Sequence, residues 1–152
     1  MVQTYSDGKY IYSVDMMFAY IEMYKPKYIE RHFDDLLDAL DYKGWGEPDK
    51  NVDFSPKDVL ENPKKYKKDY ERIQNADLSY PIIIADGKKP HIIDGVHRLT
   101  KAYIKKKTTI KAYVFDKKIL SKFIIAQYGE WDKIDALNTY DFIITFVKRF
   151  CD

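Results

Sequence analysis

Between residues 81 and 115 the chain changes its hydrophobic period twice, and this stretch constrains the fold more than any other. An apolar Pro-Ile-Ile-Ile-Ala run at residues 81–85 is followed by Asp-Gly-Lys-Lys, which has the composition of a hairpin turn. His-Ile-Ile at residues 91–93 predicts the returning strand. Apolar residues then recur at three- and four-residue spacing, which predicts a helix over residues 96–106, and residues 109–115 predict a further strand.

A five-residue motif lies where the second hairpin strand ends and the helix begins. Its members are Asp94, Gly95, Val96, His97 and Arg98. The first N–H groups of a helix have no partner within it, and the helix dipole favours an anion at that end. Gly95 would let a ligand approach the backbone, while His97 and Arg98 add two donors. Lys101 follows on the same helical face and is a further candidate phosphate contact.

Composition limits the classes of protein to consider. The chain has 152 residues, enough for one domain with a sizeable core. Its 26 basic and 24 acidic residues are too balanced to indicate a nucleic-acid or membrane partner by charge alone. The only cysteine is Cys151, which excludes an internal disulfide and is typical of a reducing compartment. No signal peptide or membrane-spanning run is present, so we expect a cytoplasmic protein with no membrane contact.

The N-terminal part predicts a strand and then helices. Residues 9–13 alternate as a short strand does, and Ser13 or Asp15 could cap a helix through Ile21. A second helix is predicted after Pro26. Its apolar face comprises Ile29, Phe33, Leu36, Leu37 and Leu40. Residues 44–54, which begin with Gly-Trp-Gly-Glu-Pro, predict a loop.

Two capping side chains that each precede a proline, Ser55 and Asn62, predict two more helices. The second helix carries a basic run formed by Lys64, Lys65, Lys67 and Lys68. Such a run is usually a solvated face, and an anionic partner is the alternative. Later, Asp116 is expected to cap a helix through Ile125, and residues 132–150 predict a long helix.

Together these elements predict an α+β fold, with a small mixed sheet and surrounding helices. We expect a single domain over residues 1–152. It would consist of a motif unit at residues 78–115, the helices before that unit, and a C-terminal helical extension at residues 116–152.

The motif unit resembles the ParB/sulfiredoxin superfamily, whose signature is an apolar strand, a glycine, two variable or basic positions, an arginine and a helix. ParB partition proteins, which bind CTP, carry Gly-Glu-Arg-Arg, and sulfiredoxin carries Gly-Cys-His-Arg. Val96 therefore replaces the glutamate of the first and the nucleophilic cysteine of the second. The free-serine kinases, which use ADP or ATP, carry Asp-Gly-His-His-Arg, from which this chain departs only at Val96.

The resemblance to the kinase branch implies a role for each motif residue. Asp94 would lie beside the reacting hydroxyl or hold the metal, and the backbone from Gly95 through Val96 would cradle phosphates. His97 and Arg98 would contact the transferred phosphoryl group. A glutamate from the N-terminal region would act as general base, and the candidates are Glu22, Glu30 and Glu47. These residue types suit phosphoryl transfer, which needs positioning and charge neutralisation more than covalent chemistry.

We therefore expect a nucleotide-binding protein of ParB/sulfiredoxin type. It would be an ATP- or ADP-dependent phosphotransferase that acts on a small hydroxyl-bearing substrate, or a nucleotide hydrolase. We expect Mg²⁺ as cofactor, and CTP is the less favoured nucleotide. The alternative is a ParB-like nucleic-acid-associated module, CTP-binding or nuclease-like, that uses the lysine-rich helix without catalytic turnover. A third hypothesis is an interaction protein whose nucleotide site has decayed.

Overall fold

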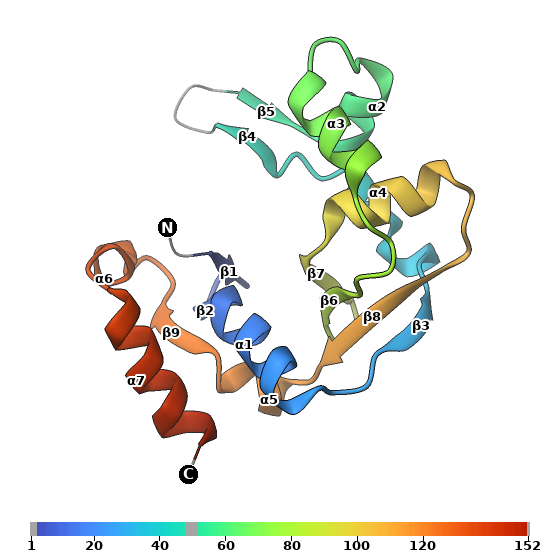
Figure 1. Cartoon of the computed structure of the whole chain (residues 1–152). Coiled ribbons are helices and arrows are strands. Elements are labelled where there is room, and N and C mark those ends of the chain that lie inside the picture. The colour runs from blue at the N-terminus through green and yellow to red at the C-terminus, as the bar shows by residue number, and fades with distance from the viewer. Residues whose placement is uncertain (1–2, 48–51, 152) are drawn as a thin grey trace. The chain divides into compact units, whose positions relative to one another are not determined.

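The structure, a computed structural model, describes residues 3–47 and 52–151, except for the side chains of Glu47 and Val52 (Figure 1). It has the predicted α+β fold, in which small sheets are surrounded by helices. The chain forms two compact units, one from Met1–Lys27 with Phe115–Asp152 and one from Tyr28–Val114. The expectation of a single domain stays a prediction, and nearly all of its motif unit lies in the second compact unit.

The first unit contains a three-stranded antiparallel sheet in the order β1-β2-β9. Ser13 ends β2, and its side chain accepts a hydrogen bond of 3.1 Å from the Met16 N–H, so it caps α1 as predicted. The elements of this unit are β1 (Thr4–Ser6), β2 (Tyr10–Ser13), α1 (Val14–Tyr24), α5 (Lys117–Ser121), β9 (Ile124–Gln127), α6 (Trp131–Asp135) and α7 (Thr139–Phe150).

Two predictions for the C-terminal extension are wrong. The helix expected through Ile125 ends at Ser121, because the next apolar residues form β9 and pair with β2. The long helix expected over residues 132–150 is instead α6 followed by α7. A reciprocal capping box between Asn138 and Asp141 starts α7 afresh, which explains the break. The extension is thus helical apart from one strand.

The second unit contains a four-stranded sheet in the order β3-β8-β6-β7 and a two-stranded β4-β5 hairpin. Figure 1 shows α3 beside α4. The elements are β3 (Ile29–His32), a 3₁₀ helix η1 (Asp34–Leu40), β4 (Trp45–Glu47), β5 (Val52–Phe54), α2 (Pro56–Glu61), α3 (Lys67–Asn75), β6 (Ile82–Ala85), β7 (His91–Asp94), α4 (Val96–Ile104) and β8 (Thr109–Phe115).

The central prediction of hairpin, helix and strand is confirmed. β6 and β7 pair in antiparallel fashion, with Ile83 opposite Asp94 and a bulge between Ile83 and Ile84. α4 begins two residues after the end of β7, and β8 follows it. The capping box predicted at Ser55 is also present, because its side chain accepts from the Asp58 N–H while the Asp58 carboxylate accepts from the Ser55 N–H.

Two predictions for this unit are wrong. The helix expected after Pro26 is a strand, β3, followed by η1, because residues 29–32 pair with β8. Its apolar spacing still describes burial from Phe33 onward, whereas Ile29 is half exposed. The loop expected at residues 44–54 contains β4 and β5, which pair with each other.

In the described part of the second unit, two separate apolar clusters support the sheet and helices. The first lies between the sheet, η1 and α4, and includes Ile82, Ile84 and Leu99. The second belongs to the segment from β4 to α3, and its buried residues are Phe54, Val59 and Ile73. α3 is therefore supported mainly by its own small core, while α4 is anchored on the sheet.

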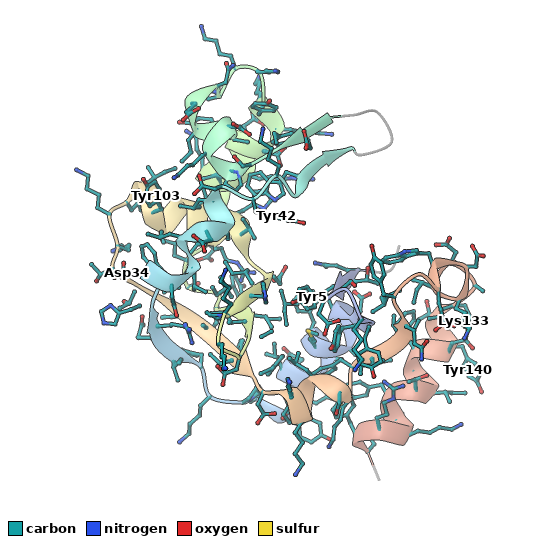
Figure 2. All side chains as sticks on the ribbon, turned by 180° about the vertical axis from the view of Figure 1, so that it is seen from behind. Tyr5, Asp34, Tyr42, Tyr103, Lys133 and Tyr140 are labelled. Atoms are coloured by element: carbon teal, nitrogen blue, oxygen red, sulfur yellow. The ribbon has the colours of Figure 1, made fainter. Side chains whose placement is uncertain are left out.

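Some large aromatic side chains remain on the surface of each unit. Tyr42, just after η1, is 74% exposed, and Tyr140 on α7 is 68% exposed (Figure 2). Within the described ranges, no helix combines the length and the apolar character needed to cross a membrane.

Candidate functional site

The motif lies at the strand-to-helix junction that the sequence predicts. Asp94 is the last residue of β7, Gly95 is the N-terminal cap of α4, and Val96 is its first helical residue. The Leu99 N–H donates to the Gly95 carbonyl at 2.9 Å, which closes the first turn. The N–H groups that precede it in the turn have no carbonyl partner within the helix, and the cap residue, a glycine, offers no side chain to them.

Gly95 is required by the backbone and by packing. Its φ of +113° lies in the left-handed region that other residues seldom adopt. A Cβ at this position would stand 2.4 Å from Cγ2 and 2.8 Å from Cβ of Ile82, a residue of β6 with no solvent exposure. The sequence argument assigned this glycine to ligand approach, and the structure adds that α4 could not seat on β6 without it.

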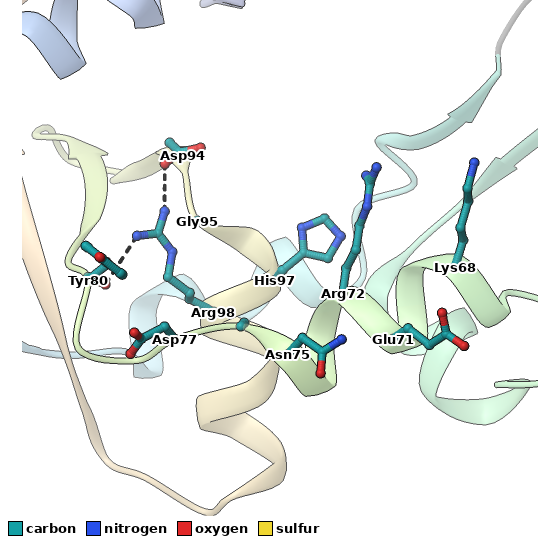
Figure 3. A pocket seen from close by; sticks show the side chains of 11 residues that line it. Lys68, Glu71, Arg72, Asn75, Asp77, Tyr80, Asp94, Gly95, His97 and Arg98 are labelled. Carbon is teal, nitrogen blue, oxygen red and sulfur yellow. Dashed lines mark hydrogen bonds and ion pairs between the residues drawn. The ribbon is translucent and has the colours of Figure 1, made fainter.

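Arg98 connects α4 to two other segments. Its guanidinium donates to the Asp94 carboxylate at 2.6 Å and to the carbonyls of Tyr80 and Pro81 at 3.2 and 2.9 Å (Figure 3). The Asp94 and Arg98 side chains are 21% and 19% exposed, so solvent screens this pair only in part. Arg98 thus fixes the position of Asp94 and of the segment that leads into β6.

His97 joins the first turn of α4 to the β4–α3 segment. Its imidazole stacks on the Trp45 indole, with ring centroids 4.4 Å apart and planes 14° from parallel. Nε2 of His97 lies 3.3 Å from Oδ1 of Asp69 on α3. This single side chain therefore contacts both the hairpin and the helix that face the junction.

A cavity of about 630 Å³ opens at the junction. Four of the five motif residues line it, namely Asp94, Gly95, His97 and Arg98. The other side is formed by α3 and by the segment that follows it as far as Tyr80 (Figure 3). The motif and α3, which are some 20 residues apart in the sequence, share one concave site.

Two predicted contact residues do not line this cavity. The Val96 carbonyl accepts a hydrogen bond of 2.7 Å from the Thr100 hydroxyl within α4. The Lys101 ammonium donates to the carbonyls of Gln74 and Ala76 at 2.8 and 2.6 Å, at the C-terminal end of α3. Lys101 therefore satisfies carbonyls that the end of α3 leaves unpaired, and its contact with a phosphate stays a prediction.

Sequence reasoning did not place beside the motif the two cations that α3 brings to the cavity, Lys68 from the basic run and Arg72. Both are exposed, and within the described part of the chain neither forms an ion pair. They lie four residues apart, so they occupy one face of the helix, and Figure 3 shows both side chains extending in the same direction. The four-residue spacing of Lys68 and Arg72 was the available signal, but the neighbouring lysines made it difficult to recognise.

Acidic groups balance these cations inside the cavity. Besides Asp94, the lining includes Glu71 and Asp77. The Asp77 carboxylate accepts bonds from the Ser79 hydroxyl and the Ser79 N–H at 2.7 and 2.9 Å, and these bonds hold the pKa of Asp77 below its ordinary value. Among the described residues no cluster of three or more His, Cys, Asp or Glu side chains could hold a metal ion. One carboxylate together with phosphate oxygens is nevertheless the usual Mg²⁺ site beside a nucleotide, and Asp94 fits it.

The three candidate general bases occupy different places. Glu22 lies on α1 in the first unit. Glu30 on β3 accepts a bond of 3.3 Å from the Thr109 hydroxyl of the neighbouring strand β8. The side chain of Glu47 is not among those that the structure describes. Neither Glu22 nor Glu30 lines the cavity, whereas Glu71, which the sequence did not suggest, does.

No protein-family model, curated protein or solved structure matches the chain. The likeness to the ParB/sulfiredoxin superfamily therefore depends on the motif residues themselves and on their place between a strand and a helix.

Proposed function

We propose that the cavity binds a nucleotide through its polyphosphate and supports transfer of a phosphoryl group to a hydroxyl or to water. The observation that carries this proposal is the pairing of Lys68 and Arg72 with the first turn of α4 around one cavity that also holds Asp94. Within the described residues, Lys68 and Arg72 form no ion pair, and the first N–H groups of α4 have no carbonyl partner in the helix. Such donors are complementary to a chain of phosphates.

The dimensions of the cavity agree with such a ligand. Its volume of about 630 Å³ falls within the range typical of small-molecule and cofactor sites. Arginine binds phosphate oxygens with two parallel donors, and lysine acts as a point charge beside them. A nucleotide is a ligand that matches both the size of the site and its mixture of cationic and polar groups.

Asp94 gives this site its chemical capability. In phosphoryl transfer an acceptor oxygen forms a bond to the terminal phosphorus while the bond to the bridging oxygen breaks, and that oxygen leaves on the remaining nucleotide, the diphosphate from ATP or the monophosphate from ADP. Asp94 would orient the acceptor hydroxyl and take its proton, or hold Mg²⁺. When bound, Mg²⁺ neutralises charge on the phosphate oxygens. Arg98 keeps Asp94 in place, and Arg72 with Lys68 offsets the charge of the leaving group.

A thermal-shift panel of ATP, ADP, GTP and CTP, each with and without Mg²⁺, tests the proposal. Binding to the folded state raises its stability by about 2.7 kcal/mol at 100 times the dissociation constant, so a bound nucleotide raises the melting temperature measurably. Stabilisation by ATP or ADP supports the phosphotransferase, and stabilisation by CTP alone favours the ParB branch. No shift with any nucleotide contradicts the proposal and favours a decayed site.

Adjacent lysines of α3 provide a matched control for that panel. Lys68 lines the cavity, whereas its neighbour Lys67 is exposed on the same helix and does not. Lys68→Gln is therefore expected to weaken nucleotide binding, and Lys67→Gln, which makes the same change in charge, is expected to leave it unchanged. Equal effects of the two variants would assign binding to the basic surface and not to the cavity.

The exposed lysine run favours a second candidate, a nucleic-acid-associated module. Lys64, Lys65, Lys67 and Lys68 are all exposed, as a surface that contacts a nucleic-acid backbone would require. For this candidate we expect duplex DNA binding that weakens steeply with salt, with a log–log slope of about −0.9 per phosphate contacted. Lys67→Gln should then reduce the slope by about one contact. A salt-independent signal, or a Lys67→Gln protein with the unchanged slope, contradicts this candidate.

A further inference from the structure

We propose that Tyr80 is the specificity-determining residue of the cavity, and that its ring stacks on the nucleotide base. This inference rests on the proposed nucleotide site and deepens it. It assigns a preference for purines.

The backbone that carries Tyr80 is held in place by several hydrogen bonds. The Asp77 carboxylate accepts from the Ser79 N–H and hydroxyl, which forms a local turn. The Tyr80 N–H donates to the Asp77 carbonyl at 3.2 Å, and Arg98 donates to the Tyr80 carbonyl at 3.2 Å. The Cα of Tyr80 is therefore positioned by the same arginine that positions Asp94.

Tyr80 lines the cavity and is 64% exposed, and in the described part of the chain its ring stacks on no other ring. A large aromatic surface on an ordered backbone loses little conformational freedom when it binds a flat partner. Such a platform suits a nucleobase, because every base offers an aromatic face.

The size of the stacked face sets the preferred base. Figure 3 shows Tyr80 beside Arg98, at the end of the cavity away from Lys68. A purine offers a larger face than a pyrimidine, so stacking on Tyr80 favours ATP, ADP and GTP over CTP.

Isothermal titration with ATP and with inorganic tripolyphosphate, which has no base, tests the assignment. Tyr80→Ala is expected to weaken ATP binding about five- to 150-fold and to leave tripolyphosphate binding unchanged. Tyr80→Phe should keep ATP affinity close to that of the unaltered chain, because the aromatic face is retained. The control is Tyr140→Ala, which removes a ring of similar exposure, 68%, from α7 in the other unit and should change neither ligand.

Each result separates the two proposals. If ATP binds and Tyr80→Ala binds it equally well, the stacking role is wrong while the nucleotide site stands. If Tyr80→Ala weakens tripolyphosphate as much as ATP, Tyr80 supports the structure of the cavity and does not read the base. If the unaltered chain binds neither ligand, the proposed function and this inference are both wrong.

Discussion

Replacing Gly95 with alanine is expected to lower the free energy of unfolding of the second unit by about 2–5 kcal/mol. The left-handed φ of +113° accounts for about 1–2 kcal/mol of this loss, because a Cβ is strained in that region. The remainder, about 1–3 kcal/mol, comes from the new Cβ, which would lie 2.4 Å from the buried Ile82 side chain. Ile82 is enclosed between α4 and the sheet, so it has little room to move.

Chemical denaturation can measure this effect in each unit separately. The chain has two tryptophans, and Trp45 lies in the second unit while Trp131 lies in the first. In a Trp131→Phe background, Trp45 fluorescence follows the unit that contains Gly95. Gly129→Ala is the control, since Gly129 has a φ of +96° with nothing within 4 Å of the added Cβ. It is read through Trp131 in a Trp45→Phe background and should lose only about 1–2 kcal/mol. Equal losses would show that contact with Ile82 is not what requires Gly95.

If the chain transfers or hydrolyses a terminal phosphate, Asp94→Asn is expected to lower the turnover rate by about 10²- to 10⁴-fold. The amide can still accept the hydrogen bond from Arg98, so we expect a change in stability of less than about 1 kcal/mol. It can neither accept a proton nor supply a full negative charge to Mg²⁺. We therefore expect the rate of ATP turnover, measured by phosphate release, to fall far more than the affinity for the nucleotide.

Asp86→Asn is the matched control for Asp94→Asn. Asp86 is an exposed carboxylate in the turn of the same β6–β7 hairpin, and it does not line the cavity. Its neutralisation should leave turnover unchanged. Turnover that persists in Asp94→Asn, or that falls equally in both variants, would remove Asp94 from the role assigned to it.

Local signals were sufficient for the part of the fold that carries the motif. The hairpin turn at Asp86 and Gly87, the glycine at the strand end and the apolar spacing of α4 all lie within one short stretch. Each of them acts between neighbours in the sequence, so the strand-to-helix junction could be predicted. Ser13 and Ser55 likewise cap the helices expected of them, but the prediction for Asn62 is wrong, because Asn62 ends α2 and α3 begins at Lys67 without a side-chain cap.

Long-range pairing explains the errors. Ile29 and Phe33 have helical spacing, yet β8, some 80 residues later, offers a partner for β3. Ile124 likewise continues the spacing of a helix but pairs with β2, more than 100 residues earlier. In both places backbone hydrogen bonds to a distant strand outweigh the local helical spacing. The hydrophobic period of a single sequence does not reveal which distant segment a strand will pair with.

For the same reason, the sequence predicted only one side of the candidate site. Asp94, Gly95, His97 and Arg98 are contiguous, so their common location followed from the sequence. Lys68 and Arg72 reach the cavity only because α3 packs beside α4. The contacts of Lys101 with the end of α3 depend on the same packing, which is why its orientation could not be predicted.

The two sides of the cavity are supported by different apolar clusters. The junction side is built on the sheet cluster around Ile82 and Leu99, whereas the α3 side is built on the small cluster of Phe54, Val59 and Ile73. If the cavity binds a nucleotide as proposed, substitutions on the surface of α3 are expected to change which anion it prefers while leaving Asp94 in place. Under the proposed function, phosphate capture by α3 and the positioning of Asp94 would depend on separate stretches of the chain, so that each could be redesigned while the other is held constant.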